Sequence, residues 1–130
     1  MPSTPANTLS SAFEDIIKKE DNISKVAEEL SKNEIIQTKL SVEEKTPSDY
    51  LSGFNEQITN FNDSYVIQPI IGSIPFIAYV FETSNPSELE EELKTKANPR
   101  WNICVEADET VIKVVDNYVF FVMSPKSFEE

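Results

Sequence analysis

The residues of this chain best suited to contact a ligand stand close together in its C-terminal third. Arg100 and Trp101 are neighbours, and Glu106, Asp108 and Glu109 follow shortly after them. A guanidinium binds carboxylates and other anions, and an indole ring stacks on flat ligands. We therefore take these five as candidate contact residues for a small ligand or a protein partner. A surface ion pair for Arg100 and core packing for Trp101 are the simpler alternatives.

The acidic residues of this region also carry the oxygen atoms that Ca²⁺ prefers as ligands. Glu106, Asp108, Glu109 and Asp116 do not have the spacing of an EF-hand loop, and no glycine provides its sharp turn. The other paired carboxylates are typical of solvated helix faces. The sequence therefore predicts neither a metal site nor another cofactor.

Five aromatic residues offer a stacking platform for sugars or for a peptide. They alternate within apolar β-type runs, which favours packing in the core instead. The five are Tyr79, Trp101, Tyr118, Phe120 and Phe121.

Several kinds of catalysis have no residues to perform them. The chain has no histidine, so it lacks the commonest general base and the main nitrogen ligand for metals. Its one cysteine, Cys104, stands in the apolar run 101–105 and is expected to be a small buried hydrophobe. Gly53 and Gly72 are the only glycines, so no glycine-rich phosphate loop exists. We expect the protein not to be an enzyme, and the remaining alternative is an enzyme that uses carboxylates alone, such as a glycoside hydrolase.

The charge of the chain argues against polyanionic partners. Its net charge is −12, from 23 acidic and 11 basic residues. Binding to phosphates needs clustered lysine and arginine, so nucleic acid and anionic membrane surfaces are disfavoured. A basic partner is electrostatically allowed, although solubility alone explains the charge.

The N-terminal half predicts helices. Residues 1–8 read as a polar linker or disordered start, and apolar residues then recur at helical spacing from Leu9. With Thr8 or Ser10 as the cap, residues 10–31 form one bent helix or two short ones. Residues 33–45 fit a short strand or irregular structure, and Thr46-Pro47 predicts a second helix that ends near Asn60.

The C-terminal half predicts two β-hairpins on either side of one helix. Pro69 and Pro75 place the first hairpin at the sheet edge or require a bulge, since proline cannot donate to a β-ladder. The last strand is apolar on both faces and should be central. The expected strands are Tyr65–Ile71, Ile74–Phe81, Val111–Val115 and Tyr118–Met123, with turns at Gly72-Ser73 and Asp116-Asn117.

The helix between the hairpins has recognisable start and stop signals. Asn85 is the expected cap, Pro86 opens the helix and Glu88 completes a capping box. Residues 90–92 are three glutamates that we expect on the solvent side, and Asn98-Pro99 ends the helix. The run 101–105 fits a further strand or a helical turn.

This half resembles a family of small, uncharacterised extracytoplasmic lipoproteins of Gram-positive bacteria. Those proteins place an apolar strand before a charged helix and end on a strand pair closed by a short turn and Tyr-Val-Phe. The resemblance covers about Tyr65–Ser124, and its most specific part is Lys113 to Val122. The helix after Pro86 is shorter than in the family, and no lipidated N-terminal cysteine is present. The family has no assigned reaction, so no catalytic residue carries over. The resemblance implies export and a role without catalysis.

Together these patterns predict an α+β fold. We expect an antiparallel sheet of about four strands in β-β-α-β-β order, with N-terminal helices packed on one face. Residues 9–124 form a single domain, and residues 125–130 a frayed tail. The predicted function is a non-catalytic extracytoplasmic accessory or binding domain, tied to a membrane only through a removed leader's lipid anchor. The alternative is a cytoplasmic acidic protein or inhibitor that presents carboxylates to a basic partner.

Overall fold

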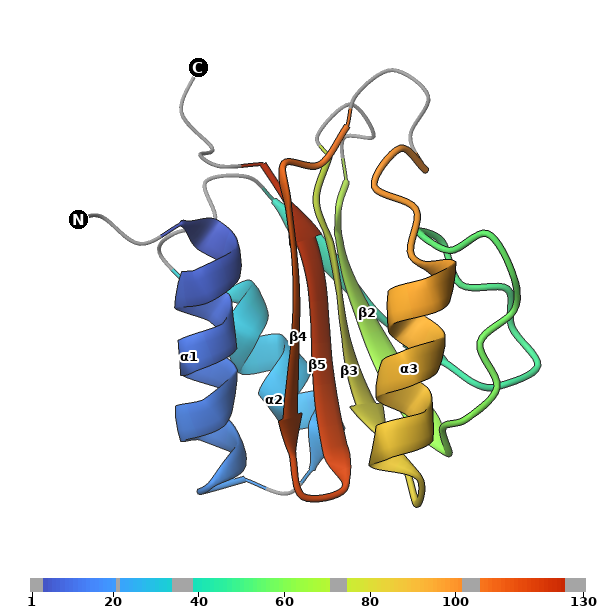
Figure 1. Ribbon diagram of the computed structural model, residues 1–130. Coiled ribbons are helices and arrows are strands. Elements are labelled where there is room, and N and C mark those ends of the chain that lie inside the picture. The colour runs from blue at the N-terminus through green and yellow to red at the C-terminus, as the bar shows by residue number, and fades with distance from the viewer. Residues whose placement is uncertain (1–3, 21, 34–38, 71–74, 102–105, 126–130) are drawn as a thin grey trace.

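One antiparallel sheet with helices on both faces makes up the computed structural model, which describes residues 4–20, 22–33, 39–70, 75–101 and 106–125. Helices α1 and α2 cover one face, and α3 covers the other (Figure 1). The predicted α+β class is confirmed. The elements are α1 (Pro5–Ile17), α2 (Ile23–Ser31), β1 (Leu40–Lys45), β2 (Asp63–Pro69), β3 (Ile77–Glu82), α3 (Pro86–Lys96), β4 (Glu109–Val115) and β5 (Tyr118–Ser124).

The sheet has five strands within the described ranges, in the order β1-β2-β3-β5-β4, rather than the four expected. The additional strand is β1, from the segment for which the sequence left strand and irregular structure open. It pairs with β2 along its whole length, from Leu40 opposite Pro69 to Lys45 opposite Ser64. The observed order after the N-terminal helices is therefore β-β-β-α-β-β, and it differs from the predicted β-β-α-β-β order by this first strand.

The expected edge position of the first hairpin is wrong, because β3 is the central strand. Pro69 is the last residue of β2 and Pro75 precedes β3, so neither removes a hydrogen bond from within a ladder. The edges are β1 and β4. The expected turn at Gly72-Ser73 lies outside the described residues.

The second hairpin is confirmed. β4 and β5 pair from Glu109 opposite Ser124 to Val115 opposite Tyr118, and the turn between them is two residues long. Asp116 adopts a positive φ of 53° there, a conformation that aspartate tolerates better than most side chains.

The N-terminal helix begins earlier than predicted. Thr4 is its cap and Pro5 its first residue, so residues 5–8 are helical rather than a polar linker, and neither Thr8 nor Ser10 is the cap. Proline is well suited to the first helical position, where its missing N–H costs nothing. Of the two alternatives for residues 10–31, the structure has two helices. The second starts after Asn22, whose Oδ1 accepts a 2.9 Å hydrogen bond from the Ser24 N–H.

The predicted helix from Pro47 to Asn60 is wrong. The Asp49 N–H donates to the Thr46 carbonyl, and the Asp49 carboxylate accepts from the Thr46 N–H at 2.8 Å, which closes a turn. Gly53 then has a φ of 96°, which no α-helix accommodates. Three apolar residues of this segment, Leu51, Phe54 and Ile58, are nevertheless buried, because the segment lies over the α3 face of the sheet (Figure 1), whereas Tyr50 is exposed.

The core has two parts, one on each face of the sheet. Side chains of β5 alternate between them, so this strand is buried on both faces as predicted. On the α1 and α2 face, Phe13 stacks on Phe120 with ring centroids 5.3 Å apart. On the α3 face, Phe54 packs against Phe121 at 4.8 Å. The segment after β1 therefore covers the α3 face of the sheet together with α3, as a second helix would.

Candidate functional site

Four of the five predicted contact residues lie in one loop, the connection between α3 and β4, and the fifth, Glu109, is the first residue of β4. A backbone hydrogen bond of 2.9 Å from the Ala107 N–H to the Pro99 carbonyl joins the two ends of this loop. It brings the segment with Arg100 and Trp101 next to the segment with Glu106 and Asp108. Residues 102–105, which include Cys104, lie outside the described residues, and so do the predictions for the run 101–105.

The five candidates differ in exposure. Arg100, Glu106 and Asp108 are exposed, Trp101 is half-buried, and Glu109 is the first residue of β4. One carboxylate oxygen of Glu109, Oε1, is buried and has no hydrogen-bond partner within the described part of the chain. The described ranges contain no group of three or more acidic or cysteine side chains placed to hold a metal ion.

Trp101 lines a groove of about 260 Å³ on the α3 side of the sheet. We call it the Tyr50–Trp101 groove. One wall comes from the segment between β1 and β2, and the other from the segment after α3. Its lining consists of Tyr50, Ser52, Gly53, Phe54, Asn55, Asn98 and Trp101. All of these are uncharged, although they belong to a strongly acidic chain.

Backbone hydrogen bonds hold the two walls together. The Asn55 N–H donates to the Lys96 carbonyl and the Asn98 N–H to the Gly53 carbonyl, each at 2.8 Å. Phe54 and Ala97 lie between these bonds as an antiparallel bridge. The groove is therefore a preformed feature of the fold, and a ligand need not order it.

Further hydrogen bonds fix each wall. The Tyr50 hydroxyl donates to the Phe54 carbonyl at 2.8 Å, while the Tyr50 residue stays 65% exposed. The buried Tyr79 hydroxyl donates to the Ser52 carbonyl at 2.7 Å, and burial raises the pKa of Tyr79 well above its usual range. The Asn98 side-chain oxygen accepts from the Arg100 N–H at 3.0 Å.

The aromatic platform expected from the sequence is mostly core. Tyr79, Phe120 and Phe121 are at most 1% exposed, and Tyr118 packs at the edge of the α1 and α2 cluster. Trp101 alone of those five lines the groove. The sequence does not single out its counterpart Tyr50, because Tyr50 stands in the segment that Thr46-Pro47 predicts to be helical.

Glu92 in α3 was expected on the solvent side, and this expectation is wrong. Its side chain is only 7% exposed. Its carboxylate accepts hydrogen bonds from the Thr59 and Asn60 N–H groups, each at 3.1 Å, and from Lys96 Nζ at 2.8 Å. Burial alone would raise the pKa of Glu92, but the hydrogen bonds from Lys96, Asn60 and Thr59 outweigh it and lower the pKa. Glu92 thus anchors the groove-bearing segment to α3.

The predicted side-chain cap of α3 is also wrong. Asn85 precedes the helix but its side chain makes no capping bond. Its N–H instead donates to the Thr83 hydroxyl at 2.9 Å. Local backbone geometry at Asn85, with φ −129° and ψ 65°, differs from the extended form that a capping side chain requires.

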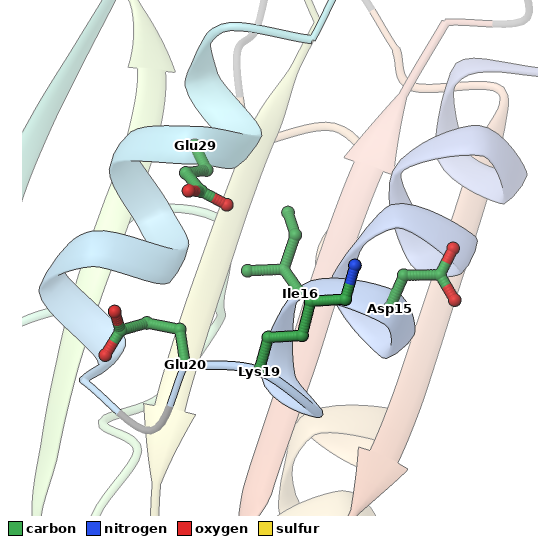
Figure 2. A pocket seen from close by; sticks show the side chains of 5 residues that line it. All are labelled: Asp15, Ile16, Lys19, Glu20 and Glu29. Atoms are coloured by element: carbon green, nitrogen blue, oxygen red, sulfur yellow. The ribbon is translucent and has the colours of Figure 1, made fainter.

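A second depression lies between α1 and α2 (Figure 2). It measures about 360 Å³ and is lined by Asp15, Ile16, Lys19, Glu20 and Glu29. Figure 2 shows Glu29 on α2, Ile16 between the helices, and Asp15 directed away from α2. Asp15 and Glu29 are exposed on α1 and α2, and Glu20 lies in the connection between these helices, so we assign no ligand to this depression.

The comparisons with known proteins add no relatives: no family model, curated protein or solved structure matches this chain. No helix within the described residues is both long and apolar enough to cross a membrane.

Proposed function

We propose that this chain is a non-catalytic binding domain and that the Tyr50–Trp101 groove is its binding surface. The observation that carries the proposal is a preformed, uncharged groove that presents a tyrosine with 65% exposure beside the one tryptophan of the chain. Exposed aromatic rings with nearby polar groups are typical of recognition sites.

The chemistry of the groove supports binding rather than turnover. Its described lining offers amide, hydroxyl and aromatic groups but no side chain that exchanges protons near neutral pH. Glu92, a buried glutamate of α3, lies shortly before the groove residue Asn98 in the chain. Its carboxylate accepts hydrogen bonds that stabilise its ionised form. It is therefore a poor general acid or base.

Thermal-shift screening tests the proposal. A ligand that binds only the folded protein raises its melting temperature. The panel contains neutral oligosaccharides, short peptides and polylysine. We expect at least one compound to raise the melting temperature of the wild type and of Ile70→Ala, but not of Tyr50→Ala. Ile70 is the matched control, because it has the same 65% exposure and does not line the groove.

Other outcomes of the screen would contradict the proposal. A stabilising compound that acts equally on Tyr50→Ala and the wild type would place the binding surface elsewhere. A shift produced by polylysine alone and abolished by salt would favour the acidic interaction protein instead, because contacts between exposed charges are screened.

We further propose that the domain works outside the cytoplasm as a lipid-anchored protein. The support is the resemblance of residues 65–124 to extracytoplasmic lipoproteins. Expression from the native gene with a fatty-acid analogue should give a labelled protein in the membrane or surface fraction. An unlabelled protein recovered entirely with the cytoplasm would refute this location.

A further inference from the structure

The Tyr50–Trp101 groove has a lining whose chemistry narrows the class of ligand. It combines two aromatic side chains with the side-chain amides of Asn55 and Asn98 and the hydroxyl of Ser52. Within the described part of the chain, the Asn55 amide and the Ser52 hydroxyl make no hydrogen bond, and Asn98 uses only its oxygen. Donors and acceptors are therefore available beside aromatic surface.

From this combination we infer that the groove is a subsite for one ring of a neutral saccharide. The inference rests on the proposed function and specifies its ligand. A sugar ring has an apolar C–H face, which packs on an aromatic ring, and a rim of hydroxyls that both donate and accept hydrogen bonds. Amide side chains suit that rim because each carries an acceptor oxygen and two donor hydrogens.

The net charge of the chain and the polar lining of the groove disfavour anionic and wholly apolar ligands. The base of a nucleotide also stacks on aromatic rings, but a nucleotide carries phosphates, which a chain of net charge −12 repels. A sugar acid meets the same repulsion. A wholly apolar ligand would cover the Asn55 amide and the Asn98 side-chain N–H groups without offering them hydrogen bonds, which costs free energy.

The size of the groove fits one ring rather than a long ligand. A volume of about 260 Å³ lies just below the range typical of sites for drug-sized molecules. The exposure of Tyr50 leaves one side of the groove open, so further rings of an oligosaccharide can extend into solvent.

The single tryptophan makes the inference directly measurable. Because Trp101 is the only tryptophan, its fluorescence reports on this groove alone. We would titrate the protein with chitotetraose and maltotetraose to about 10 mM, a concentration that saturates a millimolar site. The expected result is a saturable change of the emission of Trp101 with one of the two sugars.

Three variants define the outcome. Tyr50→Ala and Asn55→Ala should each weaken the sugar about tenfold, since each removes about 1.4 kcal/mol of contact free energy. Ile70→Ala should bind as the wild type does. Both groove positions are exposed, so these substitutions leave the core intact.

Failure of this inference is distinguishable from failure of the proposed function. If neither tetrasaccharide changes the emission while a peptide of the thermal-shift panel binds in a Tyr50-dependent way, the saccharide subsite is refuted and the binding domain stands. If a tetrasaccharide binds with equal affinity to the wild type and to Tyr50→Ala and Asn55→Ala, both the subsite and the groove are refuted.

Discussion

At the scale of single residues, Glu92 shows how one buried carboxylate organises a loop. It joins α3 to the segment that carries Tyr50 by accepting the backbone N–H groups of Thr59 and Asn60. Those N–H groups have no strand or helix partner, so the carboxylate satisfies donors that burial would otherwise penalise. The ion pair with Lys96 completes the arrangement.

The substitution Glu92→Gln should destabilise the protein by about 2 kcal/mol, because hydrogen bonds to an ionised acceptor are worth more than neutral ones. Urea unfolding at pH 7 measures this. Glu91→Gln is the matched control, since Glu91 is exposed on the same helix and should change stability by less than about 0.5 kcal/mol. Equal effects of the two substitutions would mean that Glu92 contributes no more than a surface charge.

The pKa of Glu92 gives this prediction a pH dependence. Its folded pKa is lowered from 4.5, so the ionised form stabilises the fold. That stabilisation is fully present above pH 4.5 and is lost as the pH falls through the folded pKa. The stability difference between wild type and Glu92→Gln should therefore narrow below pH 4.5. A difference that stays constant down to the acid transition would contradict the lowered pKa.

The pKa of Glu44 is shifted in the opposite direction, because the neighbour of Glu44 is another carboxyl group. It lies on β1 beside Asp63 at the start of β2, and a hydrogen bond with the Asp63 carboxyl raises the pKa of Glu44 above 4.5. Asp63→Asn removes the like charge, so the pKa of Glu44 should fall toward 4.5. A carbon-detected NMR titration of the glutamate carboxyls measures it. The same titration of the wild type is the reference.

At the scale of elements, strands and long helices follow from sequence periodicity, and irregular segments do not. The strands β4 and β5 and their two-residue turn are correct almost to the residue, because alternating apolar residues with Asp-Asn between them allow few other arrangements. The helix predicted within the segment 46–62 is wrong. Its apolar spacing suits a helix, but tertiary contacts with the sheet determine its conformation. The groove was not predicted for the same reason, since Tyr50 was assigned to that helix.

Gly53 distinguishes the two interpretations of this segment by the sign of one substitution. In a helix, Gly53→Ala would stabilise the protein by about 1 kcal/mol. In the structure, its φ of 96° and a distance of 2.9 Å from an added Cβ to Met123 Cε should make the variant about 1–3 kcal/mol less stable. Chemical unfolding of Gly53→Ala beside Ser52→Ala, an exposed neighbour, decides between them. Increased stability of Gly53→Ala would support the helical interpretation of this segment and contradict the structure.

At the scale of the whole molecule, the dominant feature is uncompensated negative charge on a well-packed three-layer fold. The described ion pairs are few and, apart from Glu92–Lys96, largely exposed, so they contribute little. The sequence predicted the charge and the fold class, since both follow from composition and periodicity. It did not predict that the segment between β1 and β2 contacts the segment after α3 to form the groove. That arrangement depends on long-range contacts such as the hydrogen bond from Asn98 to Gly53.

A net charge of −12 should make self-repulsion the main long-range electrostatic term at pH 7. Salt screens that repulsion over distances beyond about 8 Å at physiological ionic strength, while the 2.8 Å Glu92–Lys96 pair is too short and too buried to be screened strongly. We therefore expect the melting temperature to rise by several degrees between about 10 mM and 300 mM NaCl. Calorimetry of the wild type and of Glu92→Gln should give parallel increases. A melting temperature that falls with salt would mean that attractive pairs outweigh the net charge, and it would remove the argument that this surface repels anionic ligands from the groove.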